Sequence, residues 1–415
     1  MSGLNELLRA VLSEREAGRD VVLATVVRIE GSAYRRPGAR MLVTRFGRSE
    51  GAISGGCLEA DVAKKAWWLT ESGPALRSYS TADEGEDGDE TLSFGLGCNG
   101  VVHVLFERIP AGQSSELIDT LLKVRDSQRP AAIATVVATH VARQLAVGRR
   151  LLLTSDGALT GELLGTALAD QLKLDLQRTL ACGKSSLCRY LVGRHHVEVF
   201  VEFVPPPRRL VVFGAGHDVQ PLVHMAKLLG WHVSVVDGRA HFARPGRFPA
   251  ADRVLVGDIG QAFAYGDLVR GAAVAVMTHS LVQDAYWLEA VLQNEPCYVG
   301  QLGPRERTER LLAGIRERRG AIPGLELLHY PIGLDLGGDT SESVAIAVLA
   351  EIQAALNGRS GGSLRHRSAK IHSIEPIMVG GLGKGAVDDF AHQAKPLQTI
   401  PRSDVRNSGD VLLSK

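Results

Sequence analysis

Cys57 is the side chain whose sequence context most clearly suggests chemistry. An apolar strand pattern leads into Gly51-Ala-Ile-Ser-Gly-Gly-Cys-Leu-Glu59, and a helical pattern over residues 61–69 follows it. Gly55 and Gly56 free the backbone for a tight turn or a close approach to a ligand. Unpaired N–H groups and the dipole at a helix start favour a thiolate, which acts as a nucleophile, a soft-metal ligand or a sulfur carrier. The alternative is a small buried hydrophobic residue at a strand–helix turn.

An internal repeat separates the residues that make the fold from those that could do chemistry. Residues 24–58 recur at 134–168, with 12 of 35 positions identical, and the apolar strands and turn glycines are kept. The chemically distinctive positions change together: Gly56 to Thr166, Cys57 to Ala167, Glu59 to Ala169, and the loop with Arg35 and Arg36 to Val141-Ala-Arg-Gln-Leu-Ala146. This selective loss favours a functional Cys57, with Glu59 and the two arginines at the same site. Cys98, in a second glycine-flanked turn, is a weaker candidate.

Composition excludes several classes of protein. The 415 residues carry a formal net charge of +1 without a long basic run, so nucleic acid is not an expected partner. Five Cys without a CxxC pair indicate neither a disulfide framework nor a zinc site. No signal-peptide pattern and no apolar stretch of about 18 residues occur, so we expect a cytoplasmic protein without a membrane partner.

The elements that must position these residues form an α/β fold with a duplicated N-terminal unit and a Rossmann-like parallel-sheet domain. A β-branched run at 20–29 and a second strand at 41–44 lead to the Cys57 turn. We expect a first unit at 1–108, a degenerate copy at 109–204, a Rossmann-like domain at 208–357 and a disordered tail at 358–415.

The third region resembles a dinucleotide-binding layout. A buried strand at 209–213 meets Gly214-Ala-Gly216-His217, a helix follows at 221–229, and Asp237 ends the next strand. The glycines would let a pyrophosphate approach the helix start, and Asp237 could bind ribose hydroxyls. The third fingerprint position is Val219 rather than Gly or Ala. NAD or another nucleotide and a Rossmann scaffold that has lost or changed its ligand therefore both remain open.

Further candidates follow later strands of the same sheet. His279, Gly303 and Arg305 come at the carboxyl ends of strands expected at 272–277 and 297–299, the edge where ligands bind in such sheets. Asp335 lies in a loop before the helix expected at 341–356. Because domain interfaces often form ligand sites, we predict one cleft in which Cys57 faces the Gly214–Gly216 rim.

Taken together, these motifs resemble the XdhC/CoxI family, the maturation factors of molybdenum hydroxylases such as xanthine dehydrogenase. The resemblance spans about residues 5–355. It is carried by Gly31-Ser-Ala-Tyr-Arg-Arg-Pro-Gly-Ala-Arg-Met41, Ile53-Ser-Gly-Gly-Cys-Leu-Glu59, Gly214-Ala-Gly-His217, Val236-Asp237, Met277-Thr-His279, Gly303-Pro-Arg305 and Pro331-Ile-Gly-Leu-Asp335. Three positions depart from the family pattern: Tyr34 stands in place of the usual Pro, Asn99 interrupts a more glycine-rich turn, and Gly238 stands where a second acid is frequent.

The resemblance implies a non-enzymatic accessory protein that binds molybdenum cofactor (molybdopterin). It would assist sulfuration with a cysteine desulfurase and insert the cofactor into an apo xanthine dehydrogenase-type molybdoenzyme. Cys57 could ligate the metal or relay sulfur, and Arg35 or Arg36 could hold the pterin phosphate. Two other interpretations stay open: an NAD(P)-dependent oxidoreductase with a redox-active Cys57, and a nucleotide-sensing regulatory module. A homo-oligomer is compatible with the sequence.

Overall fold

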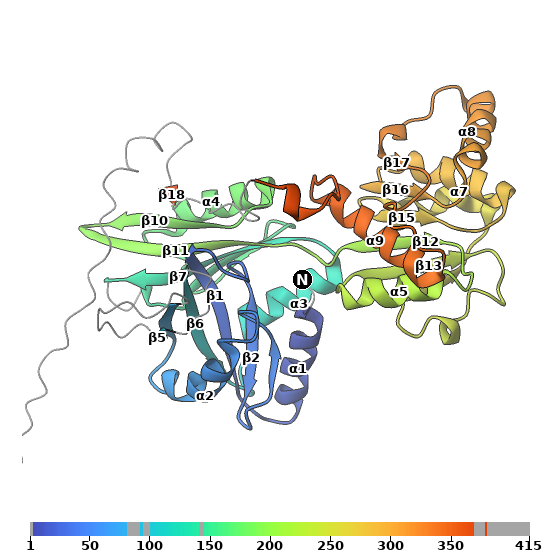
Figure 1. The fold of residues 1–415 in the computed structure, drawn as a ribbon. Coiled ribbons are helices and arrows are strands. Elements are labelled where there is room, and N and C mark those ends of the chain that lie inside the picture. Colours follow the sequence, from blue (N-terminus) through green and yellow to red (C-terminus); the bar gives the residue numbers. More distant parts are fainter. Residues whose placement is uncertain (1–2, 81–91, 94–99, 141–144, 369–377, 380–415) are drawn as a thin grey trace, which may run out of the picture.

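The computed structural model describes residues 3–80, 92–93, 100–140, 145–368 and 378–379. Figure 1 shows two parts side by side, an N-terminal part with two sheets and a C-terminal part with a third, joined by the proline-rich segment at 205–208. Cys98 and most of the tail expected after residue 358 lie outside the described residues.

The first sheet forms around β1 (Val21–Gly31), whose apolar run is buried on both faces. Val22, Ala24 and Val26 face the core that includes α2 (Glu59–Leu69), while Leu23 faces a core shared with α1 (Leu4–Glu16). The alternation of side chains along a strand explains why this run shows no polar face. The strand order is β3 (Ser49–Gly51), β2 (Arg40–Thr44), β1 (Val21–Gly31), β6 (Gly100–Ile109), β4 (Ala75–Ser80) and β5 (Leu92–Ser93).

The second sheet repeats this order strand for strand. It runs β9 (Leu159–Thr160), β8 (Arg150–Thr154), β7 (Ala131–Thr139), β11 (His195–Val204), β10 (Ser186–Val192) and β18 (Met378–Val379). The helices α3 (Glu116–Ser127) and α4 (Ala169–Cys182) precede β7 and β10 as α1 and α2 precede β1 and β4. The short edge strand β18 comes from the C-terminal segment, yet it pairs in parallel with β10 as β5 does with β4.

The two units pack against each other with an approximate two-fold exchange of contacts. Their shared core contains Leu7 and Val11 of α1 together with Leu121 of α3. Two buried ion pairs cross the interface in opposite directions: Arg40 pairs with Glu202, and Arg150 pairs with Glu107. Arg40 and Arg150 occupy equivalent places in β2 and β8, and Glu107 and Glu202 do so in β6 and β11. Each unit therefore supplies one arginine and one glutamate to its copy.

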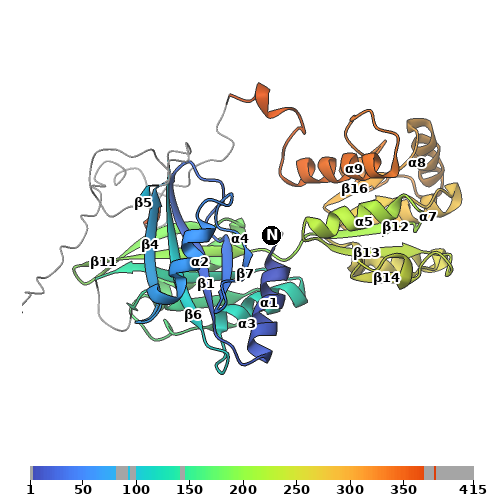
Figure 2. The same ribbon diagram turned by 60° about the horizontal axis from the view of Figure 1, so that its bottom comes forward.

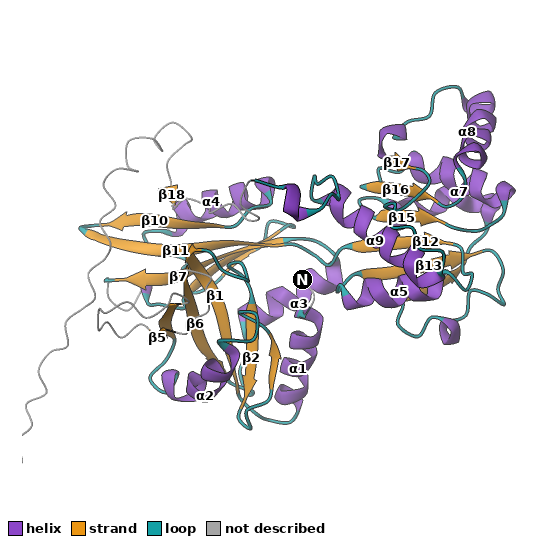
Figure 3. Cartoon of the chain, viewed as in Figure 1, coloured by secondary structure: helices purple, strands orange, loops and turns teal. Residues whose placement is uncertain are grey.

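The C-terminal part is a parallel sheet with helices on both faces, as Figure 3 shows. Its order is β14 (Arg253–Val256), β13 (His232–Asp237), β12 (Arg209–Phe213), β15 (Ala273–Val276), β16 (Tyr298–Gln301) and β17 (Leu328–His329). One face packs on α5 (Val219–Leu228) and α9 (Ser341–Leu356), the other on α7 (Leu281–Leu292) and α8 (Arg305–Arg319). A short α6 (Gly266–Val269) precedes β15. The predicted fold class, a duplicated N-terminal α/β unit followed by a Rossmann-like sheet, is confirmed.

Candidate functional site

The Cys57 turn lies between β3 and α2. Cys57 is exposed and comes directly before Leu58, the residue that caps α2. Gly56 has a φ of 113°, a conformation that favours glycine, and a Cβ added there would meet nothing within 4 Å. The structure therefore presents this thiol on an open surface at the start of a helix, as the sequence predicts.

Ser54 and Glu59 hold the turn in shape. Both carboxylate oxygens of Glu59 reach back across the turn. Oε1 accepts hydrogen bonds from the backbone N–H groups of Ile53 at 3.1 Å and Ser54 at 2.8 Å, and Oε2 accepts one from the Ser54 hydroxyl. The same Ser54 oxygen accepts from the N–H groups of Gly56 at 3.2 Å and Leu58 at 3.1 Å, and lies 3.5 Å from the Cys57 Sγ. Glu59 is thus a positioning residue for the thiol.

Burial and hydrogen bonding act against each other on the Glu59 carboxyl. Partial burial raises its pKa, but the hydrogen bonds from the Ser54 hydroxyl and the backbone N–H groups outweigh burial and leave the pKa below its usual range. The carboxylate is therefore ionised at neutral pH. Since Ser54 donates its only proton to Glu59, its oxygen can serve the Cys57 thiol only as an acceptor.

An aromatic side chain lies beside the first glycine of the turn, and a cationic side chain contacts its ring. The exposed ring of Tyr34 lies beside Gly55, where an added Cβ would stand 3.6 Å from the ring. The Arg35 guanidinium carbon lies 5.7 Å from the centre of the same ring, within the range of a cation–π contact. Arg35 and Arg36 are both exposed. An exposed thiol in a turn that contacts a flat ring, with a guanidinium on that ring, suits an anionic ligand with a planar group and a soft metal.

The second copy does not reproduce this turn. Its positive φ falls on Gly165, at 74°, which corresponds to Gly55, whereas the first copy has it one residue later on Gly56. Ser54 and Glu59 are replaced by Leu164 and Ala169, so the second turn has no counterpart of the hydrogen-bonded centre. The backbone change and the side-chain changes coincide, which places all the distinctive chemistry in the first unit.

The glycine loop of the parallel sheet meets His279 at the point where the strand order reverses. A Cβ on Gly214 would stand 2.3 Å from the Met277 carbonyl oxygen, so this close approach of β12 and β15 requires glycine. A Cβ on Gly216 would stand 3.7 Å from His279 Nε2, which contacts Asp218 at 2.9 Å. His279 has a φ of 60°, uncommon for a residue with a side chain. His217 is exposed on the same loop.

The buried Asp284 carboxylate supports the strained His279 backbone through the neighbouring Thr278. Asp284 is 1% exposed and accepts hydrogen bonds from the Thr278 N–H and hydroxyl, from Gln301 and from Arg307. This network ties the ends of β15 and β16 to α7 and α8. Gly303 precedes α8, Arg305 begins it and stacks 5.3 Å from the Tyr330 ring, and Asp335 is exposed in the loop before α9.

Asp237 stands at the end of β13 as predicted, but its carboxylate is already occupied. The residue is 0% exposed and accepts four hydrogen bonds, one from the Ala215 N–H and three from the backbone and guanidinium of Arg239. Burial raises the pKa of this carboxyl, but the Arg239 side chain and the two backbone N–H groups outweigh burial and lower the pKa. The predicted contact with ribose hydroxyls is not available to Asp237 in this structure, because a carboxylate offers about four acceptor positions.

The predicted residues therefore fall into two groups in different parts of the chain. Gly55, Gly56, Cys57 and Glu59 lie at α2, whereas Gly214, Gly216, His217, Asp237 and His279 lie around α5. Figures 1 and 2 show these helices in separate parts of the molecule from both directions. The part of the chain that the structure describes therefore does not bring the two groups together in the single cleft predicted from the sequence.

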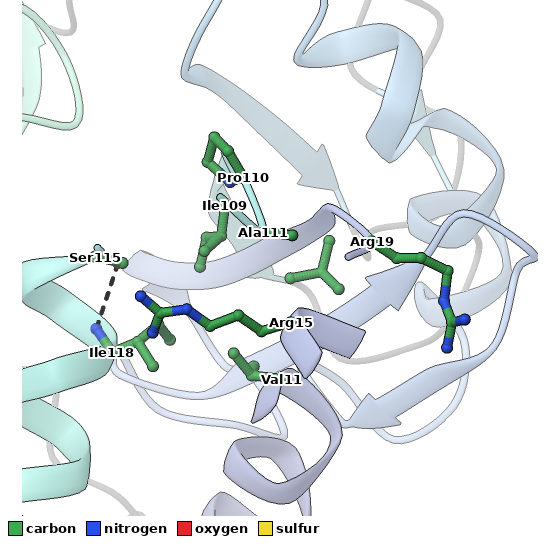
Figure 4. Close-up of a pocket in the computed structure, with 9 residues that line it drawn as sticks. Val11, Arg15, Arg19, Ile109, Pro110, Ala111, Ser115 and Ile118 are labelled. Carbon is green, nitrogen blue, oxygen red and sulfur yellow. Dashed lines mark hydrogen bonds between the residues drawn. The ribbon is translucent and has the colours of Figure 1, made fainter. Parts of the chain in front are cut away.

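A pocket away from both groups lies between α1 and the loop that follows β6. Figure 4 shows Arg15 extending across it, beside Ile109, Pro110 and Ile118. Arg15 donates a hydrogen bond to the Gln113 carbonyl at 3.1 Å and contacts Asp119 at 3.7 Å. None of the predicted site residues lines this pocket. Its second arginine, Arg19, is paired with Glu14 at 2.6 Å, so both arginines are already paired.

Sequence reasoning missed four residues that shape the two groups: Ser54, Tyr34, Asp218 and Arg239. Ser54 could have been found, because it is lost from the second copy together with Cys57 and Glu59. The only sequence signal for Tyr34 was that it stands where the family pattern usually has Pro. No sequence motif predicts roles for Asp218 and Arg239, because these roles depend on how their side chains fold back on neighbouring loops.

Membrane-spanning helices and clustered metal ligands are both absent from the part of the chain that the structure describes. None of its helices has both the length and the apolar character needed to cross a bilayer. No three His, Cys, Asp or Glu side chains there are arranged to hold a metal ion together.

Comparison with known families matches most of the chain. The profile of the XdhC and CoxI family matches twice, at residues 14–80 and 124–191. A profile described as the XdhC Rossmann domain matches residues 210–352. The two N-terminal matches fall on the two units whose sheets share one strand order.

Two relatives and one solved structure each align with more than four-fifths of this chain. A protein of Bacillus subtilis, named as a probable xanthine dehydrogenase subunit, is 31% identical over 353 residues, which are 85% of this chain and 97% of that protein. The molybdenum cofactor insertion chaperone PaoD of Escherichia coli is 24% identical over 348 residues, 83% of this chain and 86% of that protein. A crystal structure described as a xanthine dehydrogenase from Bacillus halodurans is similar with a TM-score of 0.66 and 28% identity, over 88% of this chain and 98% of that one.

Proposed function

The chain belongs to the XdhC and CoxI family, and from this premise we propose that it is a molybdenum-cofactor chaperone. It binds the cofactor as cargo, assists its sulfuration with a cysteine desulfurase, and delivers it to a xanthine dehydrogenase-type molybdoenzyme. The names of the relatives in Bacillus subtilis and Escherichia coli support the client class and the cargo. The observation that carries the proposal is the exposed Cys57 thiol in a turn braced by Ser54 and Glu59. Tyr34 lies beside Gly55 of this turn and is in contact with Arg35.

The chemistry of the cargo matches these side chains. Molybdenum in a dithiolene accepts a further soft thiolate, which Cys57 supplies after its proton leaves to solvent. The pterin carries a phosphate, for which an exposed arginine such as Arg35 is a suitable partner. The Tyr34 ring offers a flat surface against which a pterin could stack. A single thiolate with hydrogen bonds binds reversibly, as a carrier requires, because it must release its cargo to the client.

Binding of molybdenum cofactor to the purified chain tests the proposal. Cofactor released from a molybdenum hydroxylase under anaerobic conditions is mixed with the wild-type, Cys57→Ser or Cys182→Ser protein, and molybdenum and pterin are measured in the protein fraction after gel filtration. Cys182 is the matched control because it is also an exposed thiol, at the end of α4. We expect Cys57→Ser to weaken binding at least about tenfold, while Cys182→Ser binds like the wild type.

The other outcomes separate the remaining roles. Equal binding by all three proteins, with sulfuration of the client lost only in Cys57→Ser, would make Cys57 a sulfur relay rather than a ligand. No binding by the wild type would refute the chaperone function. Turnover of NADH that depends on Cys57 would instead support an NAD(P)-dependent oxidoreductase, and nucleotide binding without any thiol dependence would support a sensing module.

A further inference from the structure

Asp237, the acid at the end of β13, cannot accept hydrogen bonds from ribose hydroxyls in the usual way. In dinucleotide-binding folds this acid hydrogen-bonds the ribose hydroxyls, whereas an arginine at this place accommodates a ribose 2′-phosphate. Here both oxygens of Asp237 are used: Oδ1 by the Arg239 N–H at 2.8 Å and Nε at 3.0 Å, and Oδ2 by the Ala215 N–H and Arg239 Nη2, both at 2.8 Å. The buried carboxylate thus orients Arg239 and leaves no acceptor for a sugar.

Arginine side chains take the place of the acid at this edge. The Arg239 side chain is 37% exposed, and its Nη1 is not used by Asp237. Arg247 reaches the glycine loop and donates from Nη1 to the Ala215 carbonyl at 3.0 Å. Its Nη2 is buried without a hydrogen-bond partner. Such an unsatisfied charged donor beside a glycine loop is costly unless an acceptor joins it.

Both guanidinium groups contact the ring of Phe242. The guanidinium carbons of Arg239 and Arg247 lie 4.0 Å and 4.6 Å from the centre of its ring. The segment between Asp237 and Asp252 holds three arginines and no acidic residue. Gly238, which follows the strand acid, is exposed and adds no side chain that would oppose an anion.

We propose that the parallel-sheet domain binds a dinucleotide with a phosphate monoester on its adenosine ribose, the NADP class, and discriminates against NAD. Asp237 is a positioning residue that aims Arg239 at the phosphate, and Arg247 provides the second positive charge beside the glycine loop. This site is in the other part of the chain from Cys57, so the inference goes beyond the cargo function and does not depend on it.

Calorimetric titration of the full chain with NADP⁺ and NAD⁺ tests the inference without any variant. We expect NADP⁺ to bind at least about tenfold more tightly than NAD⁺, and 2′-AMP to compete better than 5′-AMP or inorganic phosphate. Equal affinities for NADP⁺ and NAD⁺, or no binding of NADP⁺ below about 1 mM, would overturn the inference. Inorganic phosphate that competes as well as 2′-AMP would show a general anion site and would overturn it too.

Gly238 allows a matched pair of variants that leaves the arginines intact. Gly238→Asp adds a carboxylate next to Arg239, and Gly238→Asn adds the same shape without the charge. An added Cβ would stand 3.3 Å from the Gly257 carbonyl oxygen, so both variants need the same small adjustment. We expect Gly238→Asp to weaken NADP⁺ binding at least about tenfold relative to Gly238→Asn, with little change for NAD⁺. Equal NADP⁺ affinities for the two variants would contradict the inference.

Discussion

Substitution of Glu59 by Gln should loosen the Cys57 turn by an amount that the hydrogen bonds allow us to estimate. The amide keeps one acceptor oxygen for the N–H groups of Ile53 and Ser54, but it removes the charge and turns a donor toward the Ser54 hydroxyl. Hydrogen bonds to a charged group contribute about 1.5–3 kcal/mol each and neutral ones about 0.5–1.5 kcal/mol. Three bonds would lose about 3 kcal/mol together. Because Glu59 is only partly buried, we expect about 2 kcal/mol.

Hydrogen exchange measures this loosening at the turn itself. A loss of about 2 kcal/mol in the free energy of local opening corresponds to roughly 30-fold faster exchange of the Ile53 and Ser54 amides. Asp61→Asn is the control, because Asp61 is also an acid in the first turn of α2 but pairs with Lys65 at 2.7 Å. Exchange in Glu59→Gln within about threefold of the wild type, or an equal change in Asp61→Asn, would refute the bracing role of Glu59.

Three further predictions follow from buried groups elsewhere. Glu202→Leu leaves the Arg40 charge buried and unpaired between the two units, so urea unfolding should show a loss of about 3–5 kcal/mol in the free energy of unfolding. The double variant Arg40→Met/Glu202→Leu should regain most of that loss. A loss under about 1 kcal/mol in the single variant would contradict this prediction. Asp284→Ala removes the hydrogen-bond acceptor for Thr278, Gln301 and Arg307, so the free energy of unfolding should fall by about 3 kcal/mol and the Thr278 amide should exchange faster. Unchanged exchange at Thr278 would show that the network does not support the His279 backbone. Burial, assisted by Arg28, lowers the pKa of His103, so the folded state holds it neutral while the unfolded chain binds a proton near pH 6.5. Stability present above about pH 6.5 is then lost as the pH falls below it, and His103→Gln should flatten that slope in urea unfolding measured at several pH values; equal slopes would contradict the assignment.

The sequence predicted most accurately the elements whose ends carry a glycine or a helix-capping residue. The strand at 209–213 and the helix at 341–356 have the bounds expected for them, because glycine follows the buried strand and a Thr340 side chain caps the helix start. The helix at 305–319 was missed, so Arg305 was predicted only to follow the carboxyl end of a strand, whereas it begins this helix. Its buried positions are few and it is rich in arginine, which hides the apolar pattern.

The position of a site residue was predictable where its role was not. Cys57, Gly56 and His279 lie at the turn and strand ends where the sequence placed them. The tasks of Glu59 and Asp237 were missed for one shared reason. Each folds back on a loop five or more residues earlier in the chain, Glu59 on Ile53 and Ser54, Asp237 on Ala215. Such contacts depend on how a turn curls and on one side-chain rotamer, and neither follows from residue type or spacing.

The duplication explains how an exposed thiol can also be held rigidly. The face of the first sheet opposite α2 is covered by α1 and by elements of the second copy, which form one shared core. The crossed pairs Arg40–Glu202 and Arg150–Glu107 fix the register of the two units, because a slip would leave charges buried and unpaired. The second copy kept the residues that make this interface and lost those around Cys57. Both units therefore share the interface, whereas the open turn with its thiol belongs to the first unit alone.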